Sequence, residues 1–292
     1  MAGMMPILQA VLIPFSIVAI GYILRRIRGM KPEPLAEVAM VVAAPCLIFS
    51  VLTHSEMSGD DVKWIVISAV GIVVLSGVFG WLILRATRIP SRGLYLPIMF
   101  MNAVNIPFPI VLFLWGPEGM ARAVIFYIVV VALLFTVGIA IAAGRAAWKR
   151  TLTEPVLWAT VAAFVVKGSG LDLPDSLDQG ITLLGGAAIP LVLLALGMQL
   201  ADTRLDSIRE ATVVAATRAV GGLLLGIAFA YVLNLEGLTR SIVILYSAMP
   251  PAMINAAIAL RFNSDPERVS AAVLIGTIAS LFYLPLVIRF LV

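Results

Sequence analysis

Apolar residues occur along the whole chain in long runs that short polar segments separate. The hydrocarbon core of a bilayer requires about 20 apolar residues for each crossing helix. We therefore predict an all-α polytopic membrane protein with ten transmembrane helices, whose connections are too short to hold an extramembrane domain. The predicted spans are residues 5–25, 34–53, 64–85, 92–115, 119–142, 152–170, 178–200, 209–233, 238–261 and 268–291.

Two of the predicted spans are interrupted. Residues 102–109 read Asn-Ala-Val-Asn-Ile-Pro-Phe-Pro in the fourth span, and residues 249–255 read Met-Pro-Pro-Ala-Met-Ile-Asn in the ninth. Proline removes a backbone donor and disrupts the helical ladder. Hydrocarbon cannot satisfy the freed groups, so such a break persists only where it faces protein or a water-filled cavity. Because paired breaks in matching halves point to a transporter binding site, we predict a secondary carrier.

The two halves of the chain resemble each other at matching positions. Residues 44–50, Ala-Pro-Cys-Leu-Ile-Phe-Ser, correspond to residues 189–195, Ile-Pro-Leu-Val-Leu-Leu-Ala. Five spans is an odd number, so the second half would enter the membrane from the opposite face. We predict an inverted repeat with a first half at residues 1–148, a second half at residues 149–292, and the broken fourth and ninth helices crossing near the midplane.

Composition and charge support a membrane location. The residues are 62% hydrophobic and 12% charged, whereas soluble proteins average about 25% charged. Of the 20 basic residues, 14 fall in odd-numbered loops, which the positive-inside rule places in the cytoplasm with both termini outside. The net charge of +4 then reflects topology, and we expect no nucleic-acid partner. We expect the protein in a cytoplasmic (inner) membrane of bacterial type.

The broken helices supply the candidate chemistry. The N-terminal end of a half-helix carries unpaired N–H groups and partial positive charge, which suits anions. Asn105 precedes Pro107 as an N-cap would, and Pro250 and Pro251 would open the second half-helix with Asn255 one turn inside. We expect the substrate-binding residues to be Asn102, Asn105, Ile106, Pro107, Pro250, Pro251, Met253, Ile254 and Asn255.

Simpler interpretations exist for each residue. A single proline or asparagine in a membrane helix is often a packing feature, and only the matched pair of breaks favours a site. Arg218, the one charge well inside a span, would bind an anion or, as we favour, snorkel to the interface or form an internal pair. With one cysteine, Cys46, and one histidine, His54, we expect neither a cofactor nor a metal site.

Rival functions differ in what they require. No Asp or Glu lies deep within a predicted span, which disfavours an antiporter with a midplane acid, although backbone carbonyls can hold a coupling cation. An ion or solute channel would use the same broken helices. An intramembrane enzyme would need a nucleophile–base pair, a metal cluster or paired carboxylates, for which the chain has no candidates. A sensor role without transport remains open.

Several segments together resemble the auxin efflux carrier family. They are Gly-Tyr-Ile-Leu-Arg-Arg at 21–26, the second-span motif at 44–50, Gly-Gly-Ala-Ala-Ile-Pro-Leu-Val-Leu-Leu-Ala-Leu-Gly-Met at 185–198, the ninth-span break at 249–255, and Ala-Val-Leu-Ile-Gly-Thr-Ile-Ala-Ser-Leu at 272–281. The resemblance covers essentially the whole chain, and the motif at 185–198 is the most specific part of it.

The resemblance implies two inverted five-helix repeats with proline crossovers in the fourth and ninth spans. It implies a scaffold of spans 1, 2, 6 and 7, a moving domain of spans 3–5 and 8–10, and a homodimer through spans 2 and 7. It also implies transport of a small organic anion such as malonate, malate or an auxin-like acid. The family's crossover residues would correspond to Asn105, Pro107, Pro250, Pro251 and Asn255. Unlike plant members, the third span has no acid, because Asp60 and Asp61 precede it.

Overall fold

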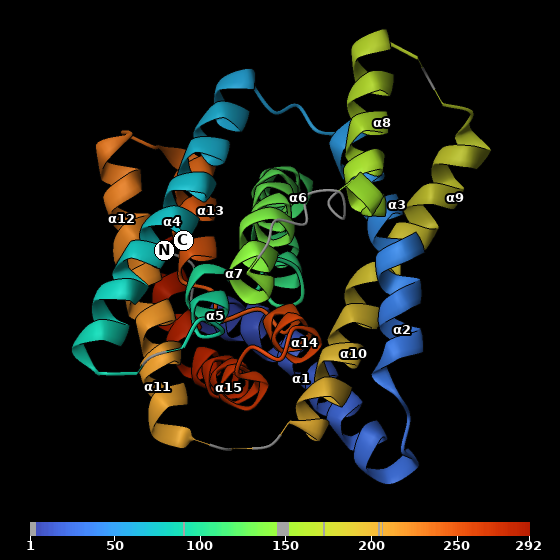
Figure 1. The fold of residues 1–292 in the computed structure, drawn as a ribbon. Coiled ribbons are helices and arrows are strands. Elements are labelled where there is room, and N and C mark those ends of the chain that lie inside the picture. Colours follow the sequence, from blue (N-terminus) through green and yellow to red (C-terminus); the bar gives the residue numbers. More distant parts are fainter. Residues whose placement is uncertain (1–3, 90, 145–151, 172, 204, 206) are drawn as a thin grey trace.

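The computed structural model describes residues 4–89, 91–144, 152–171, 173–203, 205 and 207–292 (Figure 1). Within these ranges the chain is all-helical, and its one extended pairing is an isolated β-bridge. The predicted all-α class is therefore confirmed. The predicted boundary between halves at residues 148 and 149, and the basic residues Arg145, Lys149, Arg150 and Arg204, lie outside the described residues.

Helices follow the predicted apolar runs closely. Those of the first half are α1 (Met4–Arg28), α2 (Pro32–Val38), α3 (Ala44–Thr53), α4 (Gly59–Ala86), α5 (Tyr95–Met99), α6 (Pro107–Leu133) and α7 (Ile139–Ala143). Those of the second half are α8 (Pro155–Ser169), α9 (Asp175–Gly186), α10 (Ala188–Asp202), α11 (Ile208–Ala216), α12 (Gly222–Val232), α13 (Gly237–Ser247), α14 (Ile254–Arg261) and α15 (Pro266–Arg289). Wider π-helical turns at Ala39–Ala43, Leu134–Gly138 and Thr217–Gly221 join consecutive helices.

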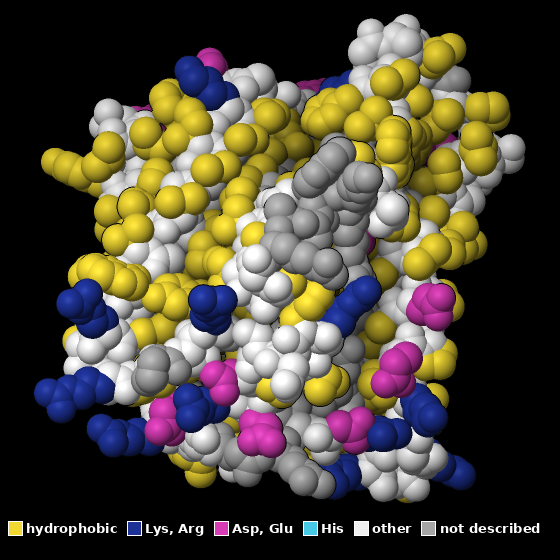
Figure 2. Space-filling model, viewed as in Figure 1, with side chains coloured by type: hydrophobic (Ala, Val, Ile, Leu, Met, Phe, Trp, Pro, Cys, Tyr) yellow, Lys and Arg dark blue, Asp and Glu magenta, His cyan; other side chains and the backbone are white. Residues whose placement is uncertain are grey.

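Among the described residues, seven helical segments are long and apolar enough to cross a membrane. The predicted spans outside these seven segments are the shorter α8 and the two interrupted segments, where each helix ends early. Figure 2 shows a broad apolar surface, with Lys, Arg, Asp and Glu side chains gathered mainly along its lower edge. This distribution is the one expected of a protein whose sides face lipid.

The helices form two packed groups that share α1 and α6 (Figure 1). In one group, α10 lies against α1 and α2, and α3 contacts α8 and α9. In the other, α4 contacts α6 and α12, α12 contacts α13, and α11 lies against α15. The α1–α10 contact depends on small residues, because a Cβ at Gly197 would lie 1.9 Å from the carbonyl oxygen of Val18.

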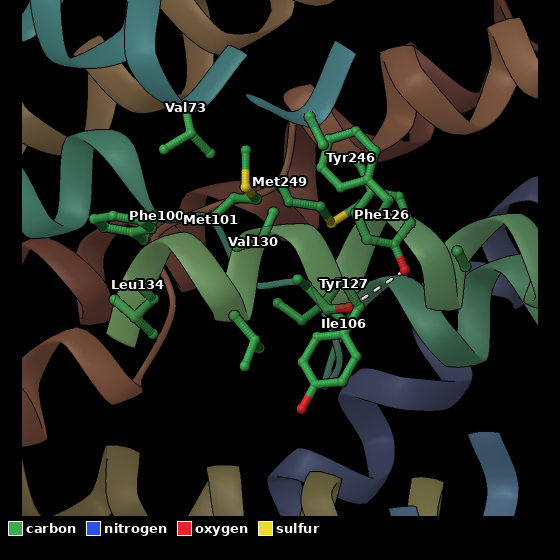
Figure 3. Packing of buried hydrophobic residues seen from close by; sticks show 14 of the residues in the cluster. Val73, Phe100, Met101, Ile106, Phe126, Tyr127, Val130, Leu134, Tyr246 and Met249 are labelled. Carbon is green, nitrogen blue, oxygen red and sulfur yellow. Dashed lines mark hydrogen bonds between the residues drawn. The ribbon is translucent and has the colours of Figure 1, made fainter. Parts of the chain in front are cut away.

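Helix α6 begins beside the first break and consists of two helices joined at a kink. At Gly116 the backbone has φ 58° and ψ −152°, a conformation that favours glycine, and Pro117 follows it. This kink separates the fourth predicted span, which ends at residue 115, from the fifth, which begins at residue 119. Beyond it, α6 is buried on most sides, as expected of a helix that is hydrophobic all round. Figure 3 shows Val130 of α6 and Leu134 just after it near Phe100, Met101 and Ile106 of the break.

Candidate functional site

The two interrupted segments meet and bond to each other. Met101 and Pro251 form an antiparallel β-bridge. The Asn102 N–H donates to the Pro250 carbonyl at 2.7 Å, and the Ala252 N–H donates to the Phe100 carbonyl at 3.1 Å. In this kind of antiparallel pair the flanking residues make the hydrogen bonds, so the missing N–H of Pro251 leaves no gap in the pairing. We call this pairing the crossover.

Asn102, rather than Asn105, caps the helix that follows the first break. The Asn102 Oδ1 accepts hydrogen bonds from the backbone N–H groups of Val104, Asn105 and Ile106 at 3.3, 2.9 and 3.5 Å. The residue at the N-cap position of α6 is Ile106, whose side chain makes no cap. Our prediction of Asn105 as the N-cap is therefore wrong, because the chain makes one further turn before Pro107 and brings Asn102 over the helix end.

The second break also differs from the prediction. Pro250 and Pro251 lie in a non-helical segment, and α14 begins at Ile254, so the prolines do not open the second half-helix. Asn255 is in the first turn of α14, where its Nδ2 donates to the Phe100 carbonyl at 2.8 Å. The prolines take part in the crossover instead: the Pro250 carbonyl accepts the bond from Asn102, and Pro251 forms the β-bridge with Met101. The carbonyl of Phe100 thus receives bonds from both Ala252 and Asn255.

Two buried polar atoms at the crossover have no hydrogen-bond partner among the described residues. They are the Nδ2 of Asn102 and the Oδ1 of Asn255, in side chains that are 3% and 0% exposed. An unpaired buried polar atom costs roughly 1–3 kcal/mol. One is a donor and the other an acceptor, so the crossover has unused capacity for both kinds of hydrogen bond.

A cavity of about 1000 Å³ reaches the crossover. Both breaks contribute to its wall, as do α2, α6, α10, α14 and α15. Of the predicted site residues, four line it: Asn102, Asn105, Met253 and Ile254. The other five are buried behind its wall and do not line it: Ile106, Pro107, Pro250, Pro251 and Asn255. The predicted site residues thus lie in the two segments that reach the cavity, four of them in its wall and five outside it, and their role in binding a substrate stays a prediction.

Sequence reasoning missed the part of the cavity wall that α6 contributes. Tyr127, Val130, Val131 and Leu134 all line it and recur at helical spacing along α6 and the π-helical turn after it. That spacing marks one helix face, but it is also the ordinary signature of packing. Gln199 of α10 is a polar residue on the cavity wall that the sequence did not single out.

The charged residues of the cavity lie at or beside helix ends. Glu33 is in the first turn of α2, Glu154 immediately precedes α8, Asp202 ends α10, Arg261 ends α14, and Glu267 is in the first turn of α15. The cavity residues contributed by the two breaks themselves are all uncharged. The crossover therefore presents hydrogen-bonding and apolar groups to the cavity.

Arg218 neither snorkels nor forms an ion pair within the described ranges, so our prediction for it is wrong. The side chain is 1% exposed. Its guanidinium donates to backbone carbonyls of Ile98, Met99 and Ser247 and to the hydroxyl of Ser76. It does not line the cavity.

A charged cluster lies elsewhere, at the start of α4. Asp61 accepts a 2.8 Å hydrogen bond from Arg122 and a second bond from the Thr239 hydroxyl, and Arg122 also pairs with Glu118 at 3.1 Å. Asp60 and Asp61 fall in the first turn of α4, which begins five residues before the predicted span. Within the described ranges, no three His, Cys, Asp or Glu side chains gather as a metal site would require.

Comparison with known proteins identifies the family of the chain. A family model described as "Membrane transport protein" matches the chain twice, at residues 6–147 and 140–288. An uncharacterised transporter of Methanothermobacter thermautotrophicus is 32% identical over 95% of this chain and 96% of its own length. A second, from Methanocaldococcus jannaschii, is 22% identical over 96% of this chain and 97% of its own.

A plant protein is similar over a shorter region. Auxin efflux carrier component 8 of Arabidopsis thaliana is 26% identical over 144 residues, which is 46% of this chain and 39% of the plant protein. The family match and the names of these relatives indicate a transporter rather than an enzyme. With the family model covering nearly the whole chain and a full-length relative above 30% identity, the chain belongs to the membrane transport protein family that includes the auxin efflux carriers.

Proposed function

We propose that this protein is a secondary carrier that moves a small organic anion, a carboxylate such as malonate, malate or an auxin-like acid, across the membrane by alternating access. The observation that carries the proposal is the hydrogen-bonded crossover of two broken segments beside a cavity of about 1000 Å³. Irregular backbone at membrane depth is tolerated where it lines such a cavity, and carriers place their sites between paired broken helices.

The proposal includes ten spans in two inverted repeats. The two matches to the family model, one in each half of the chain, support a duplication. The interrupted segments would be the fourth and ninth spans, each made of a short helix on either side of the crossover. An odd number of spans in each repeat would turn the second repeat over, which would bring the two breaks face to face.

The position of the cavity supports motion of one helix group against the other. Its walls come from α2 and α10 on one side and from α6, α14 and α15 on the other. We propose that spans 1, 2, 6 and 7 form a scaffold and that spans 3–5 and 8–10 move as a transport domain. Sliding or rocking between these groups would close the cavity on one face and open it on the other.

The proposed orientation follows the basic residues. The cavity includes Pro32 and Glu33 after the first loop, Thr203 in the seventh, and Phe262 and Pro266 in the ninth. The odd-numbered loops carry most of the lysines and arginines, which favours a cytoplasmic position. The structure would then correspond to an inward-open state, with both termini outside the cytoplasm.

A homodimer through spans 2 and 7 is part of the proposal. These spans pack closely, because a Cβ at Gly185 would lie 2.8 Å from the backbone of Leu47. Several of their apolar side chains are nevertheless exposed and available to a second copy or to lipid. They are Val38, Val41, Val42, Leu183 and Leu184.

The choice of an anion rests on the helix ends at the crossover. The segments that enter α6 and α14 line the cavity through Asn105, Met253 and Ile254, so partial positive charge is directed toward a solute. Asn105 is half-buried, and its side-chain amide makes no hydrogen bond to any described residue. The acids that line the cavity lie at other helix ends, and Asp202 is paired with Arg25 at 2.8 Å.

The test combines ligand-induced stabilisation with transport. Thermal unfolding of the purified protein is measured against a series of mono- and dicarboxylates, and the best ligand is then used in counterflow into proteoliposomes. We expect saturable counterflow that Asn105→Ala abolishes. The matched control is Gln179→Ala, which removes an exposed amide outside the cavity. Stabilisation by amines or metal cations alone would reverse the charge assignment, and unitary currents would replace the carrier with a channel.

A further inference from the structure

Arg218 is carried by an unusual turn in the middle of the protein. It lies in the π-helical turn Thr217–Gly221 between α11 and α12. Such wide turns are uncommon and are frequently associated with functional positions. The turn directs the guanidinium into the protein, where the side chain is 1% exposed.

The guanidinium joins the ends of the two helices that lead into the crossover. Its Nη1 donates to the carbonyls of Ile98 and Met99, the last two residues of α5, at 3.0 and 3.4 Å. Its Nη2 donates to the carbonyl of Ser247, the last residue of α13, at 2.5 Å. The final carbonyls of a helix accept no hydrogen bond from within the helix and carry partial negative charge. The Arg218 guanidinium thus donates hydrogen bonds to the C-terminal ends of both α5 and α13.

The surroundings supply further oxygen but no carboxylate. The Ser76 hydroxyl of α4 lies 3.2 Å from Nη1. None of the ion pairs formed by described residues includes Arg218. The charge is therefore balanced by carbonyl and hydroxyl dipoles rather than by an acid, and one donor, Nε, has no partner among the described residues.

The space for the guanidinium depends on glycine. A Cβ at Gly222 would lie 1.8 Å from the Arg218 Nη2 and 2.1 Å from the Ser247 carbonyl oxygen. No side chain longer than a hydrogen fits there while the guanidinium keeps these bonds. The π-helical turn directs the Arg218 guanidinium to the crossover, and Gly222 leaves the space that this one cation occupies.

This position has the chemistry of a coupling-ion site. In carriers with broken helices, carbonyls of unwound segments and the C-terminal ends of half-helices hold the coupling cation. Here three such carbonyls and one hydroxyl are already engaged by Arg218. We propose that Arg218 is a built-in cation that takes the place of an exchangeable coupling ion, so that transport requires neither sodium nor another metal cation.

The inference rests on the proposed carrier function, but its first test does not need transport. Thermal unfolding of the purified protein is measured in chloride salts of sodium, potassium, lithium and choline at equal ionic strength. The wild-type protein is expected to unfold at the same temperature in all four salts. A saturable stabilisation by one metal cation would overturn the inference, because it would reveal an exchangeable site.

Two variants separate the charge from the shape of the side chain. Arg218→Lys keeps the positive charge and is expected to transport at a rate near that of the wild type. Arg218→Gln removes the charge and leaves the carbonyls without a cation, so transport is expected to fall by roughly tenfold or more. The unfolding temperature of Arg218→Gln should then rise with a small metal cation more than with choline. Equal losses in both variants, or no cation response in Arg218→Gln, would refute the built-in cation.

The two proposals fail in different ways. If no carboxylate is transported but the wild-type unfolding temperature is independent of the cation, the substrate assignment is wrong and the role of Arg218 stands. If a carboxylate is transported only when sodium is present, the carrier function stands and the role of Arg218 is refuted. The wild-type measurements decide this even if Arg218→Gln cannot be purified.

Discussion

Replacing Asn255 with alanine should separate stability from transport. The Asn255 side chain is fully buried, with one hydrogen bond from Nδ2 to the Phe100 carbonyl at 2.8 Å. Its Oδ1 has no partner in the described part of the chain. The substitution removes the satisfied donor and the unsatisfied acceptor together. The Phe100 carbonyl keeps its 3.1 Å bond from the Ala252 N–H, so no backbone group of the crossover is left unpaired.

The opposing contributions to the free energy of unfolding are similar in size. Loss of a neutral hydrogen bond costs about 1 kcal/mol. The emptied space, on the order of 40 Å³, costs about 1 kcal/mol more at 24 cal/mol per Å³. Removing an unpaired buried acceptor returns roughly 1–3 kcal/mol. The net change is therefore within about 1 kcal/mol, which corresponds to a shift in Tm below about 4 °C.

The assay measures unfolding by intrinsic fluorescence in detergent and counterflow in proteoliposomes on the same preparation. Asn255→Ala should keep its Tm and lose transport, because in the proposed mechanism the unpaired Oδ1 of Asn255 takes part in transport. Asn102→Ala is the comparison variant: its oxygen accepts three backbone N–H bonds, so its loss should lower stability by about 1–2 kcal/mol. A large fall in Tm for Asn255→Ala would show that this residue only holds the crossover together, and normal transport would remove it from the mechanism.

Two further substitutions test the packing and the charged cluster. Gly197→Ala places a Cβ 1.9 Å from a backbone oxygen of α1 and should destabilise the protein by about 1–3 kcal/mol in thermal unfolding. Gly180→Ala is the control, because the space around Gly180 is open and the substitution should be neutral. Equal stability of the two variants would contradict the close contact of α1 with α10. Arg122→Gln removes the 2.8 Å pair with Asp61 and should cost about 2 kcal/mol. The exposed Arg240→Gln on the same side is its control, and similar melting of both variants would show that the cluster contributes nothing.

The sequence predicted the helices well because apolar runs of membrane length are separated by polar turns. The second span illustrates this: it was predicted at 34–53, and the continuous helical segment covers Pro32–Thr53. The breaks were also predictable, because prolines within apolar runs remove backbone donors wherever they fall. The contact between the breaks followed from the similarity of the two halves.

Details that depend on three-dimensional placement were not predictable. Either Asn102 or Asn105 precedes Pro107 closely enough to cap a helix, and only the extra turn of the chain decides between them. Arg218 appeared isolated within its span because its partners are 29 to 142 positions away along the chain. The sequence shows a buried charge but not which carbonyl groups from other helices surround it.

The pairing at the crossover has a consequence for backbone dynamics. Irregular segments usually exchange their amide hydrogens with deuterium quickly, because they open with little free energy. The amides of Asn102 and Ala252 are instead held in hydrogen bonds to the opposite segment, next to Phe100 and Met249, which are fully buried. These two amides should exchange as slowly as those of helical cores. The crossover, although irregular, is thus expected to be as rigid as the helices around it.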